Sequence, residues 1–310
     1  NMQAGVISEG TTLYVRGGRG NEVAFLIDGM YVNDPVMGGL ATRISNEAIS
    51  ELNFLSGTFN AEYGNALSGV VNIITREGGK TFTGNIEGRT SEFGFAPYNS
   101  YRENRVDVTL SGPLIGDYVS FFVTGERDAR SSWLPFGSDQ TLSSMGKLSG
   151  RIMPELKGVL TGRYSENERR PYSHSWKYIP DQYRRVREKS RQLIASFTHT
   201  VASNLFYDLR VSYFNQSYYS GVDKDTSQYI GLGDWSYLSD KGTGFEFYAV
   251  RDPIELTDNR TSTFNAKIDF VWQLEKRHEI KGGFELKKHN LKYFDVYDPK
   301  RNFPYITNFT

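Results

Sequence analysis

The chain has 310 residues with 36 basic and 36 acidic side chains, so its formal net charge is zero, and it contains no cysteine. Balanced charge leaves no basic footprint for nucleic acid, and the lack of cysteine excludes disulfides and thiol chemistry. No stretch approaches the roughly 20 apolar residues of a transmembrane helix. A membrane β-barrel is still compatible with this composition, because its lipid-facing and lumen-facing residues alternate and its mean hydropathy is therefore polar. The aromatic share of 14% also fits such a barrel.

The chain opens with short predicted strands that are separated by turns. Strands are expected at 12–15, 23–27 and 31–32. A glycine-rich turn joins the first two, and Asp28-Gly29 and Asn33-Asp34-Pro35 are turn signals after the others. A phosphate-binding glycine loop would need a helix directly after its glycines, whereas a strand follows here. We therefore expect a compact strand–turn–strand unit.

A second group of motifs lies between residues 46 and 76. A helical turn is expected at 46–49 with Asn46 as its N-cap, followed by strands at 52–56 and 69–75. The segment between these strands contains Glu62-Tyr63-Gly64-Asn65-Ala66, and the last strand ends in Val71-Asn72-Ile73-Ile74-Thr75.

Taken in order, four motifs resemble the plug domain of TonB-dependent outer-membrane receptors. They are the Arg-Gly-Gly turn, Leu-Ile-Asp-Gly, Glu-Tyr-Gly-x-Ala-x-Ser-Gly and Val-x-Ile-Ile-Thr. The resemblance implies a mainly β chain, with a small α/β plug domain at 1–79 and an antiparallel up-and-down transmembrane β-barrel at 80–310. Such receptors have about 22 strands, of which this chain would supply about nine. The TonB box would precede Asn1, so we expect an internal fragment of a longer protein.

From residue 80 onward, apolar and polar residues alternate as in half-buried strands. In 263–274 the odd positions are almost all polar, whereas the even positions are Phe264, Ala266, Ile268, Phe270, Trp272 and Leu274. The same alternation predicts about nine strands, several of them near the 9–11 residues with which a tilted strand crosses a membrane.

The connections between these strands are expected to alternate in length. Short turns fall near 112–116, 153–155, 202–203 and 275–277, and long connections near 93–103, 129–145, 167–188 and 220–259. Membrane barrels combine short periplasmic turns with long external loops. A soluble antiparallel sandwich would also alternate along its strands but would not require this pattern, so we expect a single antiparallel meander over 80–292.

Charges on the polar face of these strands must point away from lipid. A lipid-facing Arg or Lys at the bilayer midplane costs about 2–4 kcal/mol. We therefore expect a set of wall charges and two plug arginines in the lumen or at the boundary between plug and barrel, namely Arg16, Arg76, Arg105, Asp107, Lys267, Asp269 and Glu285.

The loop after the 31–32 strand is the expected substrate-facing part of the plug. In the receptors that the chain resembles, the loop after the Ile-Asp-Gly strand faces the substrate. Glycines permit a close backbone approach and methionine offers an adaptable apolar contact, so the candidates are Pro35, Val36, Met37, Gly38, Gly39 and Leu40. A connecting loop without a ligand role is the alternative.

The segments 167–191 and 220–259 interleave basic and aromatic residues. Such residues bind anionic or sugar-like ligands and the phosphates of lipopolysaccharide, but they also fold long loops, and both interpretations stay open. The candidate ligand contacts in these external loops are Arg169, Arg170, Trp176, Arg184, Arg185, Trp235 and Tyr237.

No catalytic, metal or cofactor site is expected. The four histidines are scattered and no serine lies in a Gly-x-Ser-x-Gly motif. The resemblance implies a receptor, not an enzyme, that imports a scarce substrate across the outer membrane with TonB-coupled energy. Its suggested partners are TonB, outer-membrane lipid and lipopolysaccharide, an unidentified substrate and a surface lipoprotein, with no nucleic acid. The alternatives are a surface-binding or signalling barrel without transport and a soluble carbohydrate-binding β-protein.

Overall fold

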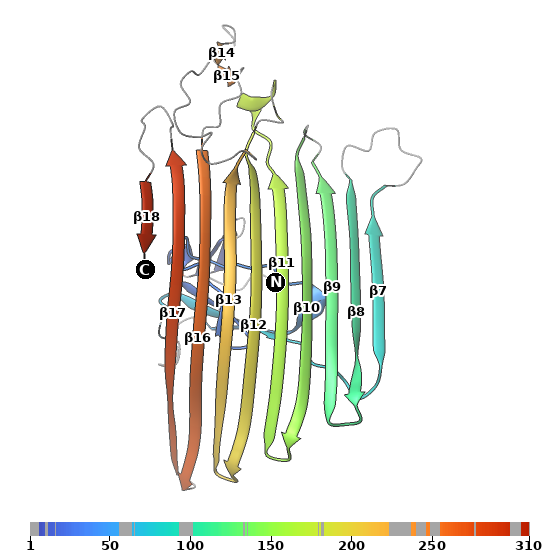
Figure 1. Cartoon of the computed structure of the whole chain (residues 1–310), viewed down its shortest axis with the longest axis vertical. Coiled ribbons are helices and arrows are strands. Elements are labelled where there is room, and N and C mark those ends of the chain that lie inside the picture. The colour runs from blue at the N-terminus through green and yellow to red at the C-terminus, as the bar shows by residue number, and fades with distance from the viewer. Residues whose placement is uncertain are drawn as a thin grey trace.

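The computed structural model describes residues 6–9, 12–15, 17–55, 64, 66–92, 102–132, 134, 136–178, 180, 183–222, 237–239, 246–248, 255–275, 277–297 and 305–309. Figure 1 shows one tall sheet, with a smaller sheet and its loops lying behind it. No helix in the described part of the chain is long and apolar enough to cross a membrane.

The tall sheet, called the wall below, is an antiparallel meander in which each strand pairs with its neighbours along the chain. It consists of β7 (Thr83–Thr90), β8 (Glu103–Ile115), β9 (Val119–Ser131), β10 (Ser138–Met153), β11 (Leu156–Arg170), β12 (Arg185–Ala202), β13 (Leu205–Gly221), β16 (Glu255–Glu275), β17 (His278–Tyr297) and β18 (Tyr305–Phe309). The strands β7 and β18 form its two edges. The predicted up-and-down topology is confirmed.

The connections alternate in length, with the short turns at one end of the wall and the long connections at the other (Figure 1). Two long connections are shorter than expected, because β9 ends at Ser131 and β10 begins at Ser138, while β11 runs to Arg170 and β12 starts at Arg185. From the sequence, each strand was expected to end where apolar and polar residues stop alternating. The hydrogen-bonded ladder continues beyond that point, since a strand with water on both faces needs no apolar period.

The smaller sheet, called the plug below, has the order β4-β3-β6-β5. Its strands are β3 (Val23–Ile27), β4 (Met30–Tyr31), β5 (Ile49–Leu55) and β6 (Gly69–Thr75), and a separate hairpin joins β1 (Val6–Glu9) to β2 (Thr12–Val15). Asp28 and Gly29 both have positive φ, 49° and 78°, between β3 and β4. Positive φ at both central residues is typical of the tight type I′ hairpin turn, as the Asp-Gly signal predicted.

The glycine-rich turn predicted between β2 and β3 ends in a short 3-10 turn, η1 (Gly20–Glu22), directly before β3. The N-cap predicted for the next helical turn needs correction. The helical turn η2 (Asn46–Ala48) is capped by Ser45, whose side chain accepts a hydrogen bond from the Glu47 amide, so Asn46 is not the N-cap. Serine and asparagine cap equally well, and sequence alone did not separate the two adjacent positions.

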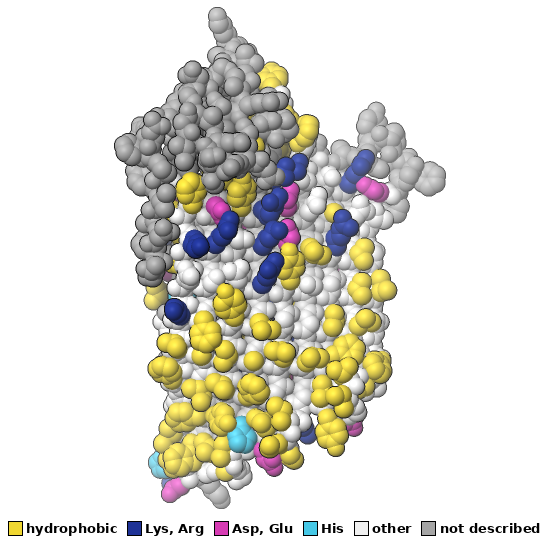
Figure 2. Space-filling model, in the orientation of Figure 1, with side chains coloured by type: hydrophobic (Ala, Val, Ile, Leu, Met, Phe, Trp, Pro, Cys, Tyr) yellow, Lys and Arg dark blue, Asp and Glu magenta, His cyan; other side chains and the backbone are white. Residues whose placement is uncertain are grey.

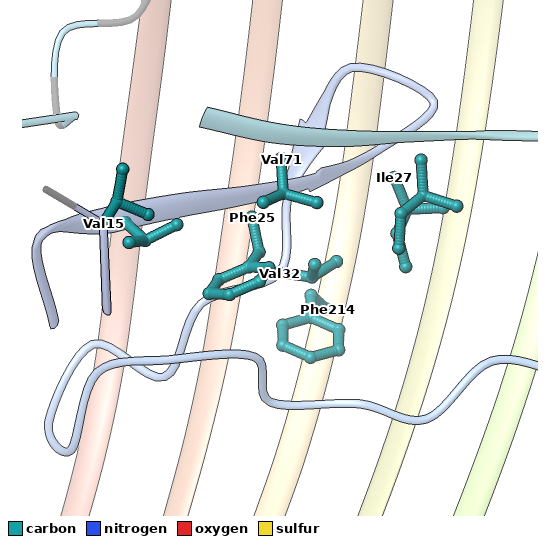
Figure 3. Packing of buried hydrophobic residues seen from close by; sticks show 8 residues of the cluster. Val15, Phe25, Ile27, Val32, Val71 and Phe214 are labelled. Carbon is teal, nitrogen blue, oxygen red and sulfur yellow. The ribbon is translucent and has the colours of Figure 1, made fainter. Parts of the chain in front are cut away.

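The plug core is completed by a side chain from the wall. Val15, Phe25, Ile27, Val32 and Val71 cluster with Phe214 of β13, which is only 2% exposed. Figure 3 shows the Phe214 ring lying beside Phe25 and Val32. A second wall contact packs Phe122 of β9 and Met145 of β10 against Ala48. The plug and the wall therefore share apolar packing.

The opposite face of the wall is apolar and uncovered. Next to buried Phe214, Tyr213 is 53% exposed, and Phe284 on β17 is 67% exposed. Figure 2 shows apolar side chains spread over the lower part of this face. No second sheet covers this face in the described part of the chain, and a soluble sandwich would bury it. This arrangement contradicts the soluble sandwich alternative and fits a wall that faces lipid.

Candidate functional site

A cavity of about 610 Å³ lies between the plug and the inward faces of β8 to β13. The plug contributes Asp34, Met37, Gly38 and the segment 40–44. The wall contributes a mostly polar and charged lining that includes Arg105, Glu126, Asp128, Arg130, Asp139, Asn167, Arg169, Glu188 and Gln216. Several of these residues lie near the strand ends that carry the long connections, so the cavity lies toward that end of the wall.

The plug loop at the cavity is tightly hydrogen-bonded. The Asp34 carboxylate accepts from the Val36 and Met37 amides at 2.8 and 3.0 Å, and the Asp34 and Gly38 backbones also bond within the loop. Gly38 has φ +74°, and a Cβ there would come within 2.4 Å of the Asn21 Cβ. Glycine is therefore needed at this position for both conformation and space. The Met37 side chain, 57% exposed, projects from this fixed loop.

Asn33 attaches the base of the loop to the plug sheet. Its side-chain oxygen accepts from the Phe25 amide at 2.7 Å, and its side-chain nitrogen donates to the Val23 carbonyl at 2.8 Å. The Asn-Asp-Pro stretch was read from sequence only as a turn signal. The structure shows that its asparagine also replaces ladder bonds that β4, a two-residue strand, does not make.

The end of the loop contacts the wall through polar side chains. The Thr42 hydroxyl lies 2.7 Å from the Ser190 hydroxyl, and the Arg43 amide donates to the Ser165 hydroxyl. Arg163, which is 8% exposed, donates to the Gln192 side chain and to Thr42. These contacts involve small hydroxyl groups on neighbouring strands, which makes the boundary polar but closely fitted.

A buried ion pair joins the plug to β10. Lys147, 3% exposed, donates to the Asp28 carboxylate at 3.0 Å and to the Thr75 carbonyl at 3.1 Å. The same carboxylate accepts from the Thr75 amide and hydroxyl. Neither Lys147 nor Asp28 was predicted as a boundary residue. Two features of the sequence could have indicated this pair. Lys147 lies among the polar positions of β10, and Asp28 lies in the Asp28-Gly29 turn.

Three arginines of the cavity lining are ion-paired. Arg105 bonds to Asp107 at 2.7 Å and contacts Glu126. Arg130 pairs with Asp128 at 2.6 Å, and Arg169 with Glu188 at 3.4 Å. Two polar atoms of the lining, Arg43 Nε and Gln216 Oε1, are buried and have no hydrogen-bond partner among the described residues. The lining therefore combines three paired arginines with one unused donor and one unused acceptor.

The remaining expected boundary charges fall in different places. Lys267 and Asp269 pair at 3.0 Å on the inward face of β16, opposite in direction to exposed Ile268. Glu285 on β17 accepts from Asn265 and pairs with Lys287. Arg76 stays within the plug, donating to the Ile49 carbonyl and lying 3.7 Å from Glu47. Arg16 lies outside the described residues.

The candidate contacts of the external loops are occupied by contacts with one another. Trp176 in η3 (His174–Trp176) is 5% exposed and lies 5.6 Å from the Tyr183 ring. Arg170 and Arg185 both approach Glu168 at 3.7 Å, and Arg184 lies over Tyr183. Among the described members of this set, only Arg169 lines the cavity. Tyr237 belongs to β14 (Tyr237–Ser239), which pairs with β15 (Glu246–Tyr248). The side chain of Tyr237 and the whole of Trp235 lie outside the described residues.

Hydrogen bonds also fix the plug's glycine-rich turn. The Glu22 carboxylate accepts from the Ser68 hydroxyl and from the Arg19 amide. The Ser68 hydrogen bond, followed by the Arg19 bond, lowers the pKa of Glu22. These bonds connect two of the sequence motifs, Arg-Gly-Gly and Ser-Gly, which lie far apart along the chain. Among the described residues, no group of three or more His, Asp or Glu is arranged to hold a metal ion.

Solved structures of outer-membrane receptors and transporters have a similar fold. The ferric preacinetobactin receptor BauA of Acinetobacter baumannii matches 96% of the chain with a TM-score of 0.70 at 11% identity. The ferripyoverdine receptor of Pseudomonas aeruginosa matches 94% with 0.69 at 16% identity, and the outer-membrane transporter YddB of Escherichia coli matches 92% with 0.68 at 13% identity. The matches cover 44%, 40% and 42% of those proteins.

A sequence relative agrees with the structural matches. The TonB-dependent transporter Oar of Myxococcus xanthus is 27% identical over 123 residues, which are 35% of this chain and 12% of Oar. The chain has the fold of a TonB-dependent outer-membrane receptor. The recognition from plug motifs, the fold class and the outer-membrane location are thereby confirmed. No family model matches the chain, and the chain spans less than half of Oar and of each of these solved proteins.

Proposed function

We propose that the chain forms the plug and first wall strands of a receptor that imports a hydrophilic substrate across the outer membrane with TonB-coupled energy. The observation that carries the proposal is the cavity between the fixed plug loop and the inward wall, toward the long connections. A ligand bound there would contact both the part that closes the barrel and the barrel itself. The substrate-facing role of the loop Pro35–Leu40 is part of this proposal.

The cavity lining supports a hydrophilic ligand. It contains five basic and five acidic side chains, so binding does not require a ligand of strong net charge. Arg43 Nε and Gln216 Oε1 offer a donor and an acceptor without partners among the described residues, and buried polar groups are normally hydrogen-bonded. Met37 adds one adaptable apolar contact. The named relatives are transporters or receptors, which supports a transport role over an enzymatic one.

The structure shows which loop positions can test a role in substrate binding. Replacing Gly38 would clash with Asn21, so loss of binding there would not identify a ligand contact. Met37→Glu changes an exposed side chain that lines the cavity, whereas Val36→Glu changes its exposed neighbour that does not line it. In the full-length receptor, we expect Met37→Glu to weaken substrate binding by about tenfold, equivalent to about 1.4 kcal/mol, and Val36→Glu to leave binding close to wild type.

The measurement is binding and uptake in cells that carry the full-length receptor, with membrane assembly checked by heat-modifiable gel migration. The substrate would first be identified by mass spectrometry of molecules retained by the receptor. Equal binding by both variants would contradict the role of the loop. Binding without uptake would favour the surface-binding alternative. Uptake that is unchanged in cells lacking TonB would contradict energy coupling through TonB.

A further inference from the structure

Three buried polar side chains on the inward face of β13 and β16 carry polar atoms without a hydrogen-bond partner in the described part of the chain. They are Gln216 and Ser220 on β13 and Asn259 on β16, which are 6%, 3% and 5% exposed. The atoms concerned are Gln216 Oε1, Ser220 Oγ and both amide atoms of Asn259. Buried polar groups are normally hydrogen-bonded, so these exceptions call for an explanation. We call the three residues the unpaired polar patch.

The unpaired polar patch adjoins the cavity between plug and wall. Gln216 and Tyr218 both line that cavity, and Tyr218 is paired directly with Asn259 on the neighbouring strand. Directly paired residues share a face of the sheet, and diagonal neighbours such as Gln216 and Asn259 lie about 7–8 Å apart. Ser220 follows Tyr218 on the same face. The patch therefore extends the lining of the cavity from β13 toward β16.

Other buried amide side chains on the inward face are hydrogen-bonded. Gln192 on β12 accepts from Arg163 and donates to the Ser212 hydroxyl. Asn167 on β11, which is 1% exposed, donates to the Asp139 carboxylate at 2.6 Å. The lack of partners at Gln216 and Asn259 is thus not a general property of amides on this face.

Asn33 in the plug shows what an amide side chain with a free donor and a free acceptor can bind. It accepts from the Phe25 amide and donates to the Val23 carbonyl, two residues earlier in the same extended strand. Asn259 offers the same acceptor and donor, and Gln216 adds a second acceptor. Backbone groups that point in one direction recur every second residue of an extended chain, at about 7 Å. This repeat is close to the spacing between Asn259 and Gln216.

We propose that the unpaired polar patch binds the backbone of a short, extended peptide. The proposal rests on the proposed import function, because it names the class of substrate that the same cavity would take. Bound backbone groups would supply the hydrogen bonds that Gln216 and Asn259 lack, as an added strand does at a sheet edge. The cavity volume of about 610 Å³ lies within the usual range of ligand pockets.

The rest of the cavity lining also favours a peptide over a sugar. The lining contains five basic and five acidic side chains, which suits a ligand with an ammonium group at one end and a carboxylate at the other. Ring-shaped ligands such as sugars commonly stack on aromatic side chains. Among the described residues that line the cavity, Tyr218 is the only aromatic one.

The experiment measures which molecules the purified full-length receptor retains in detergent. The probes are an equimolar library of tetrapeptides with free termini, the same library with every internal amide N-methylated, and maltotetraose. N-methylation removes the backbone donors and keeps the carbonyls, the side chains and both terminal charges. The test variants are Gln216→Met and Asn259→Leu. The control is Asn215→Leu, which changes the neighbour of Gln216 on the opposite face, where the Asn215 side chain donates to Ser262.

We expect the wild type and the control to retain the unmodified library about tenfold more strongly than the N-methylated one, because donors to the unpaired oxygens are lost. Each test variant should bind the unmodified library about tenfold more weakly than the control. Because the Asn259 amide has no partner in the described chain, Asn259→Leu should not lower the melting temperature of the empty receptor. A lower melting temperature would indicate a structural role for Asn259 and overturn the proposal.

The other outcomes separate this proposal from the import function. Equal retention of the two libraries, equal retention by the control and the test variants, or preferential retention of maltotetraose would overturn peptide binding and leave energy-coupled import standing. Retained peptides whose uptake is unchanged in cells lacking TonB would contradict energy coupling through TonB, while the peptide site would stand.

Discussion

Lys147 attaches the plug to the wall through a largely buried ion pair. It carries a charge at 3% exposure and shares the Asp28 carboxylate with the backbone and side chain of Thr75. A buried charge is tolerated only when it is paired and hydrogen-bonded. Solvent-exposed ion pairs contribute about 1 kcal/mol or less. The Lys147–Asp28 pair is largely buried, so its loss is expected to cost more than the loss of an exposed pair.

Removing one partner of this pair should therefore be costly. We expect Lys147→Met to destabilise plug docking by about 3–5 kcal/mol, because the Asp28 charge is left buried without its cation. Faster hydrogen exchange of the β3 and β6 amides, and easier proteolysis of the plug, would report the loss. The double variant Lys147→Met with Asp28→Asn should recover part of the protection, since no uncompensated charge remains. Exchange in the single variant at the wild-type rate would contradict this account.

Phe214 provides an apolar counterpart with a neighbouring control. Phe214 is 2% exposed in the plug core, whereas Tyr213 on the same strand is 53% exposed on the outward face. Truncating a buried phenylalanine to alanine costs about 3–5 kcal/mol. We expect Phe214→Ala to loosen the plug by this amount and Tyr213→Ala to have little effect on it, as measured by plug hydrogen exchange in detergent. Equal exchange in the two variants would show that the wall does not complete the core.

The strands could be predicted where one face is apolar. On β16, the even positions Phe264 and Ile268 are 39% and 38% exposed, while Asn265 is 2% exposed. Strand ends above the apolar part were missed because both faces there are polar, which removes the periodic signal. The cavity was only partly predictable. The plug loop followed from its position after a motif, but the wall side chains opposite it depend on cross-strand register, which the sequence does not state.

The lipid-facing assignment of β16 predicts a cost that depends on depth. Phe264 to Trp272 covers about 27 Å along the strand, so Ile268 lies near the middle of the apolar part and Leu274 near its end. We expect Ile268→Arg to destabilise the folded wall by about 2–4 kcal/mol and Leu274→Arg by about 0–1 kcal/mol. Urea titration of the receptor refolded into lipid vesicles would measure both. Similar costs at the two positions would contradict the assignment of this face to lipid.

At the scale of the whole molecule, the two faces of the wall make different contacts. The outward face presents exposed apolar side chains such as Tyr213, Ile268 and Phe284, which suits contact with lipid. The inward face presents hydroxyl groups, paired charges and a few apolar side chains that receive the plug. Because alternate residues of each strand serve the two faces, a substitution is expected to affect either lipid contact or plug contact, rarely both.

The sharing of Phe214 also has a consequence for biogenesis. Val15, Phe25 and Ile27 are synthesised long before residue 214, yet the Phe214 ring is part of their cluster (Figure 3). During export the plug segment would therefore travel with an incomplete core and an apolar surface that water reaches. A periplasmic chaperone that holds apolar segments would have most to protect in this early part of the chain. The plug core would be completed only after β13 is inserted, so assembly of the barrel would itself complete the folding of the plug.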